Sequence, residues 1–199
     1  LFNNDKDTLI AYPAGKDATS YTIPDGVTAI VDSDVFASCD FLTNIILPES
    51  LMSISYSTLS SAENLTKIQV VDGNLKYSSS EGVLFNKDKT ALIYFPRGKD
   101  ASSYTIPSSV KYVNGNAFVE CRNLESVYVW AETPPQLLEW LSIPENITFY
   151  VPSESVEKYK SAEDWKDYAD KIQGINLSIS SEDDWKAFED NGYFEALSG

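Results

Sequence analysis

Apolar residues alternate with other residues along four short segments of the chain, LTNIILP, LTKIQVV, LESVYVW and ITFYVP. A period of two is typical of a strand with one buried and one exposed face. We therefore expect one strand per segment, stacked in a parallel sheet. The side chains expected to face inward and form a continuous core are Ile45, Leu47, Ile68, Val70, Val127, Val129, Phe149 and Val151.

The opposite face of these strands carries the candidate ligand-binding residues. The alternation places six of them outward: Ile46, Gln69, Val71, Tyr128, Trp130 and Tyr150. Tyr128 and Tyr150 occupy matching positions of successive strands, and Trp130 follows two residues after Tyr128. We expect these three to form one ribbon, the aromatic strip, because Tyr and Trp are typical anchors of interfaces. The alternative is that the C-terminal helices cover the strip and make it part of the core.

The chain repeats itself on two length scales. Residues 1–27 return at residues 84–110, with 18 of the 27 positions identical. A shorter period of roughly 21 to 24 residues begins at each of three dipeptides, Ile23-Pro24, Leu47-Pro48 and Ile106-Pro107. That length is typical of leucine-rich repeats, whose coils bury a core only by stacking.

The segment IPDGVTAIVDSDVFASCDFLTNIILP resembles the leucine-rich repeat of BspA-like bacterial surface proteins. YSSSEGVLFNKDKTALIYFPRGKDASSYTIP resembles the stretch that interrupts such repeats, and ETPPQL with FYVPSESVEKYKSAEDWKDYADKI resembles the end of such arrays. One unit departs from the pattern, with Leu59 and Ala62 where its neighbours have Phe and Cys. The resemblance covers roughly residues 1–172. It implies a mainly β leucine-rich repeat solenoid and adhesion to host or bacterial proteins at a bacterial surface.

The domain organisation follows from the same patterns. We expect a solenoid over residues 1–152, with antiparallel hairpins at 1–12 and 82–95 standing out of it, and a helical cap over 153–177. Ser153 is expected to cap the first cap helix, and Ser161 with Asp164 to begin the second. Residues 178–199 are either a tail helix or the truncated start of a further module. Because Leu1 begins a hairpin abruptly, we also expect more repeats ahead of it in the parent protein.

Charge and composition exclude several kinds of partner. The chain has 30 acidic and 15 basic residues, a net charge of −15, so nucleic acid and anionic membranes are expected to repel it. No run approaches the roughly 18 apolar residues that a membrane span needs. Histidine is absent, which removes the commonest general base and metal ligand. We expect a monomer that binds neutral or basic partners.

Two arrangements that suggest covalent or metal chemistry have simpler explanations. Cys39 and Cys121 occupy the same repeat position about three coils apart, which places them about 14 Å apart at roughly 4.8 Å per strand. That is too far for a disulfide. Asn3, Asp5 and Asp7 resemble the start of a calcium loop, but the required Gly and the closing Glu are missing, so we expect a polar hairpin turn.

Acidic residues at turns are the remaining candidates for catalysis. Glycoside hydrolysis needs two carboxyl groups about 5 to 9.5 Å apart across a cleft. Glu49, Glu120, Glu125 and Glu132 are expected at turns or on the convex side, outside any aromatic-lined pocket. We therefore expect no catalytic residues, no metal and no cofactor.

The sequence thus favours a non-enzymatic extracellular recognition module that binds a host or bacterial surface protein through the outward strand face. One alternative is a carbohydrate-binding component of a polysaccharide-capture system, which would use the same aromatic strip. A second alternative is a passive structural stalk.

Overall fold

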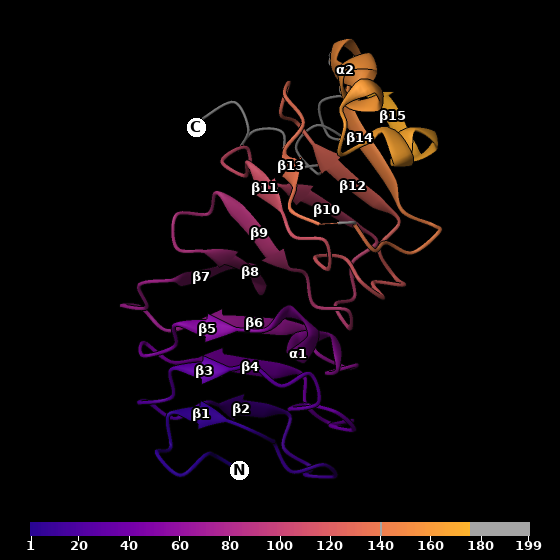
Figure 1. Cartoon of the computed structure of the whole chain (residues 1–199). Coiled ribbons are helices and arrows are strands. Elements are labelled where there is room, and N and C mark those ends of the chain that lie inside the picture. Colours follow the sequence, from indigo (N-terminus) through magenta and orange to yellow (C-terminus); the bar gives the residue numbers. More distant parts are fainter. Residues whose placement is uncertain (140, 176–199) are drawn as a thin grey trace, which may run out of the picture.

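The chain folds into a solenoid of stacked coils, as the repeats predict. The computed structural model describes residues 1–139 and 141–175. In its N-terminal half, β1 (Thr8–Leu9), β3 (Ala29–Ile30) and β5 (Ser53–Ile54) pair in parallel and form one column. Beside it, β2 (Ser20–Thr22), β4 (Asn44–Leu47) and β6 (Lys67–Val70) form a second parallel column (Figure 1). Each coil thus contributes two strands instead of the expected one, because two-residue strands are too short to show alternation.

The C-terminal half also contains two sheets. A parallel sheet consists of β10 (Ser103–Ile106), β12 (Ser126–Val129), β14 (Thr148–Pro152) and β15 (Ile172–Ile175). A mixed sheet has the order β13 (Gln136–Leu137), β11 (Tyr112–Val113), β9 (Ala91–Tyr94), β8 (Val83–Asn86) and β7 (Tyr77–Ser80). A short helix, α1 (Tyr56–Ser60), lies in the coil before β6.

The hairpin expected at residues 82–95 exists but does not stand out of the solenoid. β8 and β9 pair in antiparallel fashion, while β9 also pairs in parallel with β11. The side chains of these two strands are mostly buried, including Leu84, Phe85 and Tyr94. The expectation was wrong on this point because the apolar residues on both faces of the hairpin pack between neighbouring coils. At residues 1–12 the corresponding pairing is reduced to one bridge between Phe2 and Leu9.

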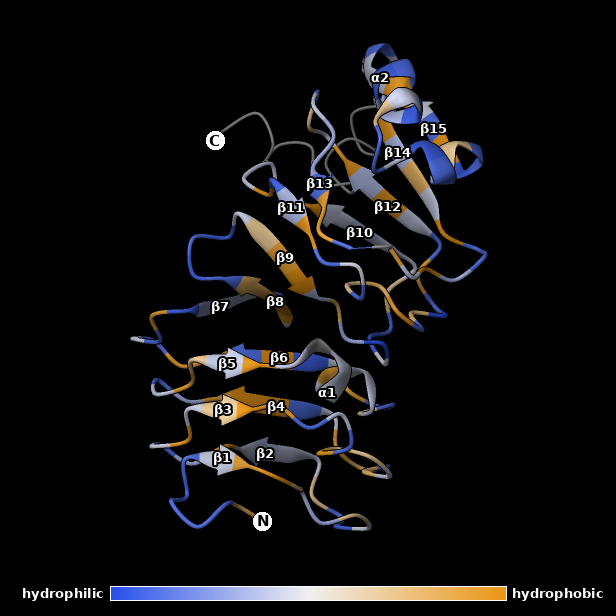
Figure 2. Ribbon diagram, viewed as in Figure 1, coloured by the Kyte–Doolittle hydropathy of each residue, from blue (hydrophilic) through white to orange (hydrophobic). Residues whose placement is uncertain are grey.

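The inward side chains form the core, as the alternation predicts. Seven of the eight expected residues are buried, and Val70 packs against the core while partly exposed. The strongest hydrophobic colours in Figure 2 lie on strands such as β4 and β9. Both cysteines, Cys39 and Cys121, are buried and free in the structure.

The cap contains less helix than expected. Its last strand joins a sheet of the solenoid. It comprises η1 (Ser153–Ser155), α2 (Val156–Ser161) and η2 (Lys166–Lys171), and then β15. None of these helices has a side-chain cap, so the expected roles of Ser153 and Ser161 are wrong. Ile172 begins a strand that pairs with β14. The tail expected at residues 178–199 lies outside the described residues.

Candidate functional site

The aromatic strip lies on the outward face of β12 and β14. The alternation S-V-Y-V places Val127 and Val129 in the core, so Tyr128 lies on the opposite face. The register pairs Tyr128 with Tyr150 on the neighbouring strand. Three residues that are separated in sequence are thereby brought to one place on the surface, as the spacing predicts.

The rings of the strip contact one another. The ring centroid of Tyr128 lies 5.3 Å from that of Tyr150 and 5.7 Å from that of Trp130, with interplanar angles of 23° and 22°. These are offset-stacked pairs, the arrangement that aromatic quadrupoles favour. All three side chains are half-buried. Partial burial raises the pKa of Tyr128, and the neighbouring Tyr150 hydroxyl raises this pKa further.

The described part of the cap packs inward, away from the strip. The Trp165 ring packs edge-on against the inward-facing Phe149 ring, with 5.1 Å between the ring centroids. Trp165 Nε1 also donates a hydrogen bond to the Pro135 carbonyl at 2.7 Å. Tyr168 donates to the Leu141 carbonyl at 2.9 Å. Trp165 and Tyr168 therefore do not cover the strip. They fill the open end of the solenoid core instead.

The other three candidate residues lie on a different sheet. Ile46 on β4 pairs with Gln69 on β6, and Gln69 Oε1 accepts a hydrogen bond from Asn44 at 3.1 Å. Val71 follows β6, is 42% exposed and lines a hollow of about 190 Å³. The segment that carries β7 and β8 lies against β6, where Gly82 accepts a hydrogen bond from the Ile68 amide at 2.9 Å. This insertion separates the six candidates into two surfaces, so the expected continuous face does not exist.

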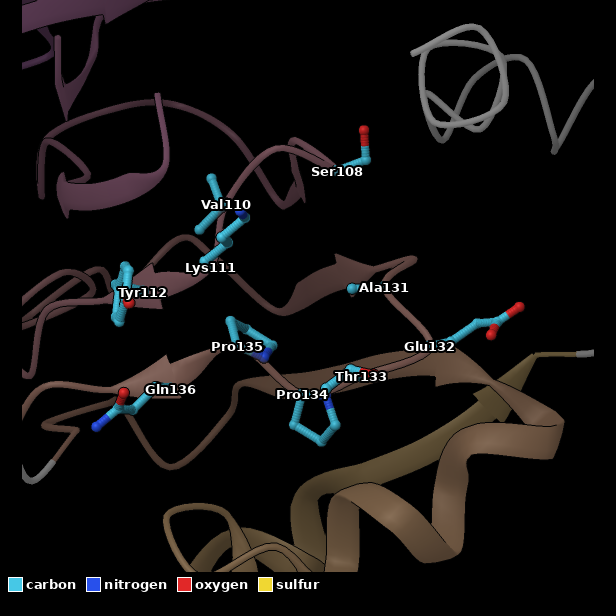
Figure 3. A pocket seen from close by; sticks show the side chains of 10 residues that line it. All are labelled: Ser108, Val110, Lys111, Tyr112, Ala131, Glu132, Thr133, Pro134, Pro135 and Gln136. Carbon is cyan, nitrogen blue, oxygen red and sulfur yellow. The ribbon is translucent and has the colours of Figure 1, made fainter. Parts of the chain in front are cut away.

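A cleft that was missed in the sequence opens at the carboxyl ends of β10 and β12. Its volume is about 440 Å³, and its two walls are the segments 108–112 and 131–136 (Figure 3). The second wall begins at Ala131, directly after Trp130 of the strip. The lining combines apolar and polar side chains: Ser108, Val110, Lys111, Tyr112, Ala131, Glu132, Thr133, Pro134, Pro135 and Gln136.

Contacts from the cap hold one wall of the cleft in place. Tyr159 Oη donates to the Ala131 carbonyl at 2.7 Å, and Lys158 Nζ donates to Thr133 Oγ1 at 2.8 Å. The Gln136 amide donates to the Lys111 carbonyl at 2.8 Å, which joins the two walls. These hydrogen bonds tie the two walls to each other and to the cap. Glu132 is the single carboxylate in its lining, so the cleft itself holds no pair of acids.

Comparison with known families decides the classification. A model described as the BspA type leucine-rich repeat region matches residues 12–134 in 6 copies. The chain belongs to this family. The six BspA-type copies are twice the three units that the dipeptide spacing identified.

Several solved structures are similar to this BspA-type chain. The pneumococcal vaccine antigen PcpA is 18% identical with a TM-score of 0.42, covering 77% of this chain and 60% of that one. A leucine-rich cell surface protein from Faecalibacterium prausnitzii is 18% identical with a TM-score of 0.44, covering 84% and 62%. A leucine-rich repeat protein from Eubacterium ventriosum is 22% identical with a TM-score of 0.38, covering 67% and 59%. No curated protein matches the chain. The BspA-type chain thus spans about 60% of the length of these proteins.

The polar turns of the two BspA-type hairpins are explained by internal hydrogen bonds. Asn3 Oδ1 accepts from the Asp7 and Thr8 amides, both at 3.1 Å, and Asn86 Oδ1 accepts from the Ala91 amide at 2.8 Å. Asn3 Nδ2 also donates to Asp7 Oδ1 at 2.6 Å, and this bond, followed by the one from the Thr8 hydroxyl, lowers the pKa of Asp7. Within residues 1–139 and 141–175, no group of three His, Cys, Asp or Glu side chains is arranged to hold a metal ion. No helix of the same residues is long and apolar enough to cross a membrane.

A sequence signal for the cleft was available in this BspA-type chain. The dipeptide Pro134-Pro135 supplies two rigid, apolar residues to the wall of the cleft. In the sequence analysis this dipeptide indicated only that the repeat array ends nearby. Its role in a cavity depends on β11 and β13 lying side by side, a contact between segments more than twenty residues apart.

Proposed function

We propose that this protein is a non-enzymatic recognition module that binds another protein outside a bacterial cell. The observation that carries the proposal is the stacking of Tyr128, Trp130 and Tyr150 on the outward face of a rigid parallel sheet. Tyr and Trp supply a large contact area at a low cost in conformational entropy. The family to which the chain belongs supports binding as the general role.

The strip and the cleft together form a surface suited to a polypeptide. The strip provides half-buried rings on β12 and β14, and the cleft continues from the end of β12 with Ala131. A loop or an extended segment of a partner would place apolar side chains on the rings and enter the cleft between Lys111 and Pro135. Such a central anchor with a polar rim is the usual anatomy of a protein interface.

The net charge sets the kind of protein that the surface fits. With a net charge of −15, the protein attracts basic partners over the range of the Debye length and repels acidic ones. Association with a basic partner should therefore be faster at low ionic strength. Neutral partners would depend on the aromatic contacts alone.

The proposal is tested with an array of extracellular proteins probed with the labelled chain. Tyr128→Thr and Tyr150→Thr remove the rings while keeping residues that favour strands. Each variant is expected to lose about tenfold or more in affinity for the proteins that the unaltered chain binds. Phe41→Thr is the matched control, because Phe41 is an exposed ring that precedes β4, which lies in a different sheet from β12 and β14. Equal binding by all three variants, with unfolding curves that show each to be folded, would refute the proposal.

A glycan is the second candidate ligand, because sugars also stack on aromatic rings. The offset stacking of the strip covers part of each ring face, whereas a sugar platform needs a face open to the ligand. A glycan array probed with the same three variants separates the two candidates. Glycan signals that Tyr150→Thr abolishes, without any protein signal, would replace the protein partner by a carbohydrate.

A further inference from the structure

The turn between β8 and β9 gathers positive charge in a protein whose net charge is −15. Lys87 and Lys89 lie in this turn, at the left of Figure 1. The Lys87 amide donates to the Lys76 carbonyl at 2.8 Å, and the Lys111 amide donates to the Thr90 carbonyl at 2.7 Å. Two further lysines therefore lie beside the turn. We define the lysine patch as Lys76, Lys87, Lys89 and Lys111.

The ammonium groups of the lysine patch are not neutralised by ion pairs with the surrounding chain. Among residues 1–139 and 141–175, the basic side chains that form salt bridges are Arg97, Arg122 and Lys166. Lys76 and Lys87 lie opposite each other in the antiparallel register of β7 and β8, where like charges repel. Asp88, in the same turn, offsets one of the four charges. The patch therefore keeps a surplus of positive charge.

The first copy of the long repeat contains a turn with the same backbone. The Lys6 amide donates to the Asn3 carbonyl at 3.2 Å, and the Lys89 amide donates to the Asn86 carbonyl at 3.1 Å. Lys6 and Lys89 also share a positive φ, 60° and 52°. The two turns can therefore be compared position by position.

The charges at the two turns differ although their backbones match. Thr28 corresponds to Lys111, because its amide donates to the Asp7 carbonyl at 2.7 Å. The differences in charge between the two turns are Asn4 to Lys87, Asp7 to Thr90 and Thr28 to Lys111. Each of these differences makes the second turn more positive. The turn forms without the added lysines, so its backbone does not explain their presence.

Two exposed apolar side chains border the lysine patch. Leu75 precedes Lys76 and is 74% exposed, and Tyr112 follows Lys111 and is 40% exposed. Lys111 and Tyr112 lie on one wall of the cleft, and the Glu132 carboxylate points away from them (Figure 3). Lysine is a point charge on a flexible stem, so it fits carboxylates whose spacing varies along a chain. Apolar contact inside a polar rim is typical of protein interfaces.

We propose that the lysine patch is an interaction surface for an acidic segment of a partner polypeptide, with an apolar residue of that segment packed on Tyr112. At physiological ionic strength the Debye length is about 8 Å, so the patch attracts the segment at contact while charges elsewhere on the protein are largely screened. An anionic glycan would use the charges but would bring no strongly apolar group to Leu75 and Tyr112. The inference goes beyond the proposed function, which rests on the aromatic strip, and shares only the cleft residues Lys111 and Tyr112 with it.

The test measures binding of a labelled peptide of about ten residues, rich in Glu with one Leu, by fluorescence anisotropy at about 0.15 M salt. The same peptide with Gln in place of Glu is expected not to bind. Lys89→Asn should lower the affinity for the Glu peptide about threefold, and the double variant Lys87→Asn, Lys111→Thr, which carries the residues of the first copy, about tenfold. Unchanged affinity in both variants, or no binding by the unaltered chain, would overturn the proposal.

Lys6→Asn in the first copy is the matched control for Lys89→Asn. Both substitutions remove one positive charge from the same position of the same turn, and Asn tolerates the positive φ that both positions require. Lys6→Asn should leave the affinity for the Glu peptide unchanged, with unfolding curves that show both variants to be folded. Equal losses in the two variants would show that net charge acts in place of the patch, against the proposal.

A competition experiment identifies the class of ligand. A short oligosaccharide of uronic acids presents carboxylates without apolar side chains. It is expected to displace the labelled Glu peptide about tenfold more weakly than the unlabelled peptide does, because it lacks the contact with Tyr112. An oligosaccharide that competes as well as the peptide would assign the patch to an anionic glycan and overturn the proposal.

Discussion

Tyr12 and Phe95 occupy the same position of the long repeat and differ by one hydroxyl group. Each ring packs on a Tyr and on a Phe of the next coil. The centroid distances are 4.6 and 6.2 Å for Tyr12, and 5.0 and 5.9 Å for Phe95. The Tyr12 hydroxyl is buried and has no hydrogen-bond partner among the described residues. A buried polar group without a partner costs free energy, which the Phe95 position avoids.

Tyr12→Phe is expected to raise the free energy of unfolding by about 1 kcal/mol, because it removes the buried unpaired hydroxyl. Tyr94→Phe is the matched control. The Tyr94 hydroxyl donates to the Leu59 carbonyl, so its removal should lower the free energy of unfolding by a similar amount, about 1 kcal/mol. Urea unfolding at constant m-value measures both. Loss of stability in Tyr12→Phe would show that the hydroxyl is solvated.

At the scale of elements, one hairpin sequence takes two forms. Residues 84–95 form the antiparallel pair of β8 and β9, with Phe85 fully buried. Residues 1–12 have nearly the same sequence but form a single bridge, and Phe2 is only half-buried. In the second copy, β8 also pairs with β7 in antiparallel fashion.

Phe85→Ala is expected to lower the free energy of unfolding by about 3 to 5 kcal/mol, the usual cost of removing a fully buried ring. Phe2→Ala, at the same position of the first copy, should cost much less, about 1 kcal/mol, because part of that ring is already in water. The two variants are compared by urea unfolding. Equal losses would mean that the first hairpin is as well packed as the second.

At the scale of the whole molecule, the pH dependence of stability is set by buried Cys and Tyr side chains that stay protonated in the folded protein. Burial raises the pKa of the Cys121 thiol to about 12, and burial also raises the pKa of Tyr94, Tyr104 and Tyr159. In the unfolded chain these groups titrate near their ordinary values, about 8.5 for Cys and about 10 for Tyr. The folded protein therefore keeps protons that the unfolded chain releases as the pH rises.

The free energy of unfolding is expected to be nearly constant between about pH 6 and 8.5 and to fall as the pH rises above about 9. The free energy of unfolding stays nearly constant in the lower range because the chain has no histidine, the side chain that ordinarily titrates there. The decline follows because the unfolded chain releases thiol and phenol protons in this pH range, whereas the folded protein keeps them. Urea unfolding at a series of pH values measures this decline. Cys121→Ala should reduce the part that begins near the ordinary thiol pKa, and Cys39, whose pKa burial also raises, should account for the rest of that part. A free energy of unfolding that rises above pH 9 would contradict the conclusion that burial raises the pKa of these Cys and Tyr side chains.

The solenoid and its core were determined by local pattern. The alternation in β4, β6, β12 and β14 names the inward residues correctly, because a strand in a stacked coil has only two faces and one must be buried. The stacking of Tyr128 on Tyr150 follows from the same periodicity. Exclusion of a disulfide between Cys39 and Cys121 needed only the number of coils between them.

The tertiary structure alone decided the environment of each copy. Leu84 is buried and Leu1 is exposed although their sequences match, because burial depends on which coil lies next to them. The split of the candidate face into two surfaces, the cleft between residues 108–112 and 131–136, and the inward packing of Trp165 likewise arise from contacts between distant segments. A local pattern specifies which face of a strand is apolar, whereas the neighbour that covers that face is chosen by the whole fold.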